Sequence, residues 1–88
     1  AAFRELVAKC RAAHRAANGD DADLLVGIQL THSGRYCRNP VVACRDPILE
    51  GRPGAVVPPL ATDDELARLA DDYVATAKLA RQVGFDFV

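Results

Sequence analysis

The stretch that decides the fold is a near-continuous apolar run at residues 24–30, which reads Leu24-Leu25-Val26-Gly27-Ile28-Gln29-Leu30. A short apolar run of this kind is typical of a strand buried on both faces, as in a parallel sheet that helices cover. Gln29 is the one polar residue in the run and lies near its C-terminal end. In α/β barrels that end of a strand faces the active site. Gln29 is therefore the first candidate for a functional side chain.

An amphipathic helix is predicted before this strand, over residues 3–17. Its apolar side chains recur at helical spacing on one face, and its basic side chains lie outside that face. Asn18-Gly19 follows, two residues that tolerate a left-handed backbone just past a helix end. The apolar face consists of Phe3, Leu6, Val7, Cys10, Ala13 and Ala17, and the basic residues outside it are Arg4, Lys9, Arg11 and Arg15.

A second helix is predicted after Thr62-Asp63-Asp64-Glu65, which has the pattern of a capping box. In this motif the Thr62 hydroxyl accepts a hydrogen bond from the Glu65 amide, and the Glu65 side chain reaches back. The two aspartates suit the positive end of the helix dipole. An apolar stripe then continues to Val83, Gly84 is a natural stop, and residues 85–88 begin another strand.

Residues 31–61 show no periodicity and contain all five prolines, so we expect one long loop there. Long loops of this kind usually carry function, and in a barrel they lie over the catalytic mouth. The order is thus helix, strand, long loop, helix and the start of a strand, which is typical of βαβ units with parallel strands. Because both ends read as cut, we expect residues 1–88 to be part of a larger domain.

Composition excludes several classes of protein. The net charge is −1 and no basic stripe appears, so we expect no nucleic-acid partner. No apolar run approaches the roughly 20 residues that span a bilayer, so we expect no membrane partner. Three cysteines at scattered positions favour reduced thiols and a cytoplasmic location. Their irregular spacing relative to the two histidines argues against a metal site, and we assign no metal ligand.

Residues 27–36, Gly-Ile-Gln-Leu-Thr-His-Ser-Gly-Arg-Tyr, resemble the Gln-Leu-x-His-x-Gly-Arg segment of the Old Yellow Enzyme superfamily of NADH:flavin oxidoreductases. Residues 80–88, Ala-Arg-Gln-Val-Gly-Phe-Asp-Phe-Val, are similar to the Ala-Gly-Phe-Asp-x-Val segment that follows in these proteins. The resemblance implies a fragment of an FMN-binding (β/α)8 TIM barrel. It also implies an enzyme that transfers hydride from NADH or NADPH, through the flavin, to a small activated alkene or related acceptor.

By this resemblance Gln29 contacts the pyrimidine edge of the flavin, and a carboxamide has both the donor and the acceptor that such an edge requires. The alternative is a buried amide that neighbouring backbone satisfies. No catalytic residue is assigned, because in similar enzymes the substrate-polarising pair comes after the next strand. That position lies beyond Val88.

Three residues of the same motif have open roles. His32 is either catalytic or, as we prefer, bonded to the loop that it begins. Arg35 either contacts a phosphate or substrate or, as we prefer, braces its loop against Asp46 or Glu50. Tyr36 resembles a tyrosine of dienoyl-CoA reductase-like members, and its role is left open.

A second class of function is a small αβ interaction module without enzymatic activity. Two parallel strands on their own would expose apolar faces and unpaired backbone. That reading therefore predicts association with other copies, and a homo-oligomer is left open for the enzyme as well.

Overall fold

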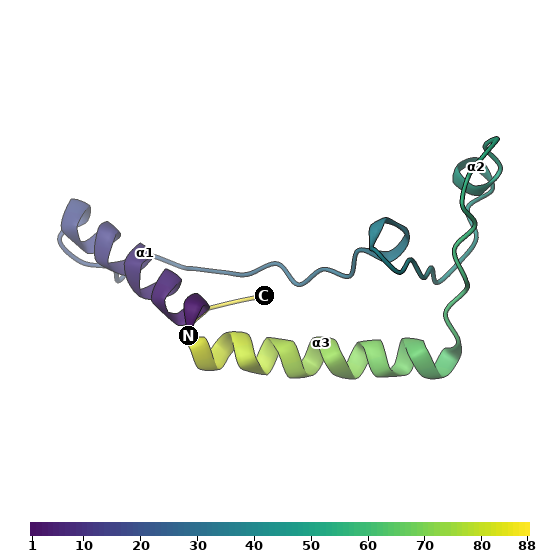
Figure 1. The fold of residues 1–88 in the computed structure, drawn as a ribbon. Helices are drawn as coiled ribbons and strands as arrows, with labels where there is room; N and C mark the ends of the chain where they lie inside the picture. Colours follow the sequence, from purple (N-terminus) through teal and green to yellow (C-terminus); the bar gives the residue numbers. More distant parts are fainter. The chain divides into compact units, whose positions relative to one another are not determined.

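The computed structural model describes all 88 residues. It contains the helices α1 (Ala2–Asn18), α2 (Pro47–Glu50) and α3 (Asp63–Val83), and one 3₁₀ turn, η1 (Gly34–Tyr36) (Figure 1). The chain forms two compact units. The first consists of residues 1–30 with 73–88 and the second of residues 31–72, so that the boundary falls within α3.

Helix α1, in the first unit, confirms the predicted helix with one more residue at each end. Gly19 ends it with a φ of 93°, in the region that L side chains rarely adopt, and its N–H donates to the Arg15 carbonyl at 2.8 Å. The predicted role of Asn18-Gly19 is thereby confirmed. A residue with a Cβ would be strained at position 19 because of this φ.

The predicted apolar face of α1 packs only in part: Val7 lies in the core and the Phe3 ring contacts Phe85, but much of the face stays exposed. Val7 is buried, but Phe3 and Leu6 are 56% and 52% exposed. Two arginines predicted to lie outside that face also contact the C-terminal segment: Arg4 donates to the Gln82 carbonyl and Arg11 to the Asp86 carboxylate. Long basic side chains can cover apolar surface with their stems while the charged end finds a carboxylate or carbonyl.

The predicted strand at 24–30 is extended but forms no continuous ladder. Gly27 and Phe87 make a single parallel bridge, with hydrogen bonds from Ile28 N to Phe87 O at 3.2 Å and from Asp86 N to Val26 O at 2.8 Å. The expected burial on both faces is also absent in these residues, since Leu25 is 71% exposed. The physical reason is that only Asp86 and Phe87 of the C-terminal segment hydrogen-bond to the run, and a ladder needs longer partners.

The core of the first unit is small. Val7 of α1, Ala80 of α3 and Phe85 are buried together, and Val26, Ile28 and Val83 pack against them. The Phe3 and Phe85 rings meet edge to face, with centroids 6.2 Å apart. Val26 and Ile28 are two residues apart and reach the same core, as expected of extended backbone, whose side chains alternate between faces.

The second unit corrects the expectation of a structureless loop at 31–61. Within it are η1, the single turn α2 and a parallel bridge between Val42 and Leu60. Val42 N donates to Pro59 O at 3.1 Å and Ala61 N to Val42 O at 2.9 Å, and the Arg45 side chain donates to Pro58 O. These hydrogen bonds satisfy the backbone locally, so the segment needs no helical or strand periodicity to be ordered.

The capping box of α3 is confirmed. Glu65 N donates to the Thr62 hydroxyl at 3.2 Å, and Thr62 N donates to the Glu65 carboxylate at 2.7 Å. Both hydrogen bonds satisfy donors that the first turn of a helix leaves unpaired. At the other end Gly84, with a φ of 110°, stops α3 as predicted.

This cap predicts a pH dependence. The Thr62 amide and then the Thr62 hydroxyl, by hydrogen bonding to Glu65, hold the pKa of that carboxyl below its ordinary value. A lowered pKa means that the cap stabilises α3 fully above the ordinary glutamate pKa of about 4.3 and is lost as the pH falls through the lower, folded value. We expect the helical circular dichroism signal to decrease over this range. In Glu65→Gln this component of the pH dependence should vanish, and an unchanged titration would contradict the assignment.

Candidate functional site

The Gln29 side chain lies on the extended run of the first unit and is exposed to solvent. Its carboxamide makes no hydrogen bond within the 88 residues, so neighbouring backbone does not satisfy it here. A free carboxamide offers two donors and an acceptor to a ligand, and this fits the neighbouring N–H and C=O groups at the pyrimidine edge of a flavin.

Close packing two residues before Gln29 depends on a glycine. A Cβ at Gly27 would overlap the Phe87 ring, which lies over this position. The ring covers a stretch of backbone that has no side chain of its own, an arrangement known to stabilise glycines within sheets. Phe87 is nevertheless 57% exposed, so its other face is open.

Asp86 connects three segments of the first unit. Its Oδ2 atom accepts from Arg11 Nη2 at 2.6 Å and from Val26 N at 2.8 Å. Arg11 also lies 3.7 Å from the Asp21 carboxylate, which Arg15 contacts at 3.0 Å. Asp86 was not predicted to be a functional residue, although it is the only acidic residue of residues 80–88. A carboxylate at the start of an otherwise apolar strand could have indicated its role.

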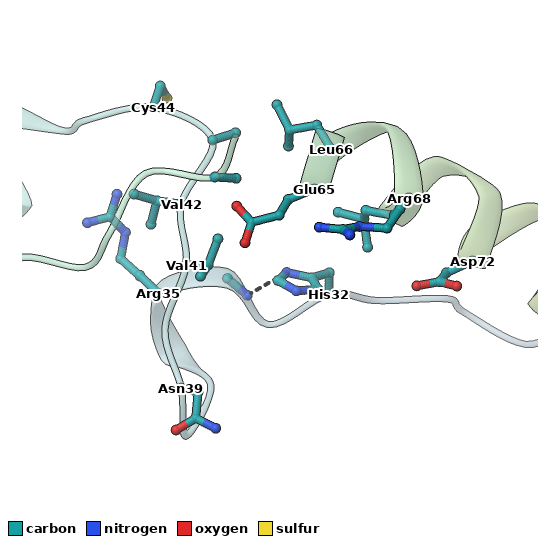
Figure 2. A pocket seen from close by; sticks show the side chains of 14 residues that line it. His32, Arg35, Asn39, Val41, Val42, Cys44, Glu65, Leu66, Arg68 and Asp72 are labelled. Atoms are coloured by element: carbon teal, nitrogen blue, oxygen red, sulfur yellow. Dashed lines mark hydrogen bonds between the residues drawn. The ribbon is translucent and has the colours of Figure 1, made fainter. Parts of the chain in front are cut away.

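His32 belongs to the second unit and lines a pocket there of about 650 Å³. Its Nδ1 accepts from Gly34 N at 3.1 Å, which confirms the preferred role of bonding the loop that it begins. When Nδ1 accepts, a neutral imidazole carries its proton on Nε2 and can donate from there. Figure 2 shows this hydrogen bond and the ring beside the pocket.

The walls of the pocket differ in chemistry. Val41 and Val42 lie on one side, and the α3 side chains Glu65, Arg68 and Asp72 extend along the other (Figure 2). The Glu65 carboxylate is engaged by Thr62 in the cap. The pocket can therefore accept a group with an apolar body and a polar end. None of the hydrogen bonds among its lining residues joins a nucleophilic side chain to a general base.

Arg35 braces its loop, as preferred from the sequence, and the carboxylate that it uses is Glu50. Arg35 Nη1 lies 2.7 Å from Glu50 Oε1, and the two side chains are only 19% and 8% exposed. Glu50 Oε2 also accepts from Asp46 N at 2.8 Å. One half-buried carboxylate thus links η1 to both ends of α2.

Asp46, the other carboxylate considered as a partner of Arg35, instead caps a helix. Its side chain caps α2 by accepting from Ile48 N and Leu49 N at 2.9 and 3.1 Å. The Leu49 amide and then the Ile48 amide hold the pKa of Asp46 below its ordinary value. The sequence carried this signal, because an aspartate followed by proline at the first helical position is a common helix start. A helix of four residues is nevertheless too short to show a periodic apolar pattern.

Tyr36 is 83% exposed and borders a shallow pocket with Arg52 and Val56 in the second unit. The three cysteines carry free thiols, and the single S–H of Cys37 lies within hydrogen-bonding reach of the carbonyls of Gly34 and Asn39, at 3.1 and 2.9 Å from Sγ. No group of three or more histidine, cysteine or acidic side chains lies close enough together to hold a metal ion. No helix combines the length and apolarity that crossing a bilayer requires.

Comparison of the chain with models of protein families, with curated proteins and with solved structures found no match.

Proposed function

We propose that these residues belong to an FMN-dependent oxidoreductase with a (β/α)8 barrel, and that Gln29 contacts the pyrimidine edge of the flavin. The observation that carries the proposal is the free, exposed carboxamide of Gln29 at the C-terminal end of the extended run. An exposed amide with no partner in the protein is available to hydrogen-bond a ligand.

The connection between the two extended segments supports a barrel. Residues 24–30 and 85–88 pair in parallel through the bridge of Gly27 and Phe87, and α3 lies between them in the sequence. Parallel neighbours require a crossover connection, and in (β/α)8 barrels each crossover contains a helix. The two segments that resemble the Old Yellow Enzyme superfamily, residues 27–36 and 80–88, fall at the two extended segments that this connection joins.

Uncovered apolar side chains also support a larger domain. Leu25 is 71% exposed on the extended run, and Val74 and Leu79 are 55% and 58% exposed on α3. In a barrel the central strands are buried on both faces, and the helices cover their outer side. An interaction module formed by these residues would expose the same apolar surface for association with other copies, so self-association is the property that distinguishes the two functions.

Bound FMN would supply the hydride-transfer chemistry, with NADH or NADPH as the reductant. This chain's own contribution is to orient the ring through the Gln29 carboxamide. The catalytic acid and the substrate-polarising groups are not assigned to any residue of these 88.

The test is the visible absorption spectrum of the intact protein, purified and then treated anaerobically with NADPH or NADH. Flavin bands that bleach on reduction are expected. A colourless protein that also fails to take up added FMN would remove the flavin function and return Gln29 to a structural amide. The proposal of a barrel would then rest only on the order and pairing of the helices and extended segments.

A further inference from the structure

We propose that Asp86 is the positioning residue that sets the face on which Gln29 is presented. This inference rests on the proposed FMN function, because it assigns a role toward the same ligand contact. Asp86 does not itself touch the flavin in this proposal. It acts through the backbone of Val26, three residues before Gln29.

The geometry joins Asp86 to Val26 twice. The Asp86 backbone N–H donates to the Val26 carbonyl, and the Val26 N–H donates to the Asp86 side-chain carboxylate, both at 2.8 Å. The carboxylate thereby occupies the place that a strand carbonyl would take in a ladder. Arg11 donates to the same carboxylate oxygen at 2.6 Å and so links this junction to α1.

The register that follows decides where Gln29 points. With Val26 held against Asp86, Ile28 N reaches Phe87 O, and the Val26 and Ile28 side chains pack on the core of Val7, Ala80 and Phe85. Gln29 is one residue out of phase with Val26 and Ile28 and is exposed. A slip of one residue would exchange the two faces, because side chains alternate along extended backbone. Gln29 would then turn toward the core.

The backbone pairing alone is a weak determinant of this register. It consists of one isolated bridge with two interstrand hydrogen bonds, at 2.8 and 3.2 Å. The carboxylate adds a charge-assisted bond to each of two donors, and bonds of that type are stronger than neutral ones. The other charged groups around the junction are Asp21 and Arg15, which belong to the same cluster as Arg11.

The experiment measures FMN affinity by flavin fluorescence in the intact protein and its variants. Asp86→Ala is expected to weaken binding about tenfold, a loss like that from removing Gln29 contacts. Asp86→Asn keeps an acceptor for Val26 N–H and should lose less. In the double variant Asp86→Ala/Gln29→Ala the two losses of affinity should not add, because each change removes the same contact between Gln29 and the flavin. Fully additive losses, or wild-type affinity in Asp86→Ala, would overturn the proposal. Asp71→Ala, at an exposed aspartate of α3, is the matched control.

A second measurement separates this inference from the proposed function. Amide hydrogen exchange at Ile28 reports the register without any ligand, and Asp86→Asn should accelerate it at least several-fold while exchange in the middle of α1 stays unchanged. If the wild-type protein takes up no FMN but Ile28 exchange responds, the FMN function fails and the register role stands. If Ile28 exchange does not respond, the positioning role fails whether or not FMN binds.

Discussion

Replacing Gln29 with alanine in the intact protein is expected to weaken FMN binding roughly ten- to hundredfold and to change the reduction potential of the flavin. The carboxamide can form two hydrogen bonds with the ring edge, and each contributes about 1 kcal/mol net. Two such bonds correspond to a loss in this range. The potential should also move, because hydrogen bonds to the ring tune the electronics of the flavin.

The control for this change is Gln82→Ala, the same substitution at an exposed position of α3. The Gln82 side chain makes no hydrogen bond, and only its backbone carbonyl accepts from Arg4. Isothermal titration with FMN and a redox titration of the bound flavin compare the two variants. If Gln29→Ala leaves both the affinity and the potential at their wild-type values, the assignment of Gln29 is wrong.

The second large effect is expected at Glu50, in the other unit. Glu50→Ala should destabilise the loop by about 2 kcal/mol, because it removes the acceptor of Arg35 Nη1 and of Asp46 N. Losing one member of a mostly buried ion pair leaves the other charge poorly compensated. The 19% exposure of Arg35 places the cost below that of a fully buried pair.

Limited trypsin digestion reads this opening directly, since Arg38 and Arg45 lie in the loop. When cleavage follows the population of the open state, a loss of about 2 kcal/mol raises the cleavage rate about thirtyfold. Glu50→Gln should give a smaller increase, because it keeps an acceptor but not the charge. Glu5→Ala, at an exposed glutamate of α1, should leave these two cleavage rates as they are. Equal rates in Glu50→Ala and wild type would show that the pair does not hold the loop.

The sequence was sufficient for features that depend on near neighbours. The bounds of α1 and α3 agree with the structure to within one residue, and the Thr62–Glu65 capping box and the glycine stops at 19 and 84 are present. Each of these depends on interactions within about one helical turn, which a local pattern records. The preferred roles of His32 and Arg35 in their loop were also confirmed, and both contacts lie within 15 residues. The flavin contact of Gln29 remains a prediction.

Tertiary structure alone decided which faces pack and which distant residues meet. The pairing of Arg11 with Asp86 joins positions 75 residues apart, and no periodic pattern encodes such a contact. It adds Arg11 to the side of α1 on which Val7 and Phe3 contact Phe85, while Leu6, on the expected apolar face, stays 52% exposed. The physical reason is that an amphipathic pattern records only that a face is apolar. Which residues cover that face, and which carboxylate a nearby arginine contacts, depend on the packing of the whole unit.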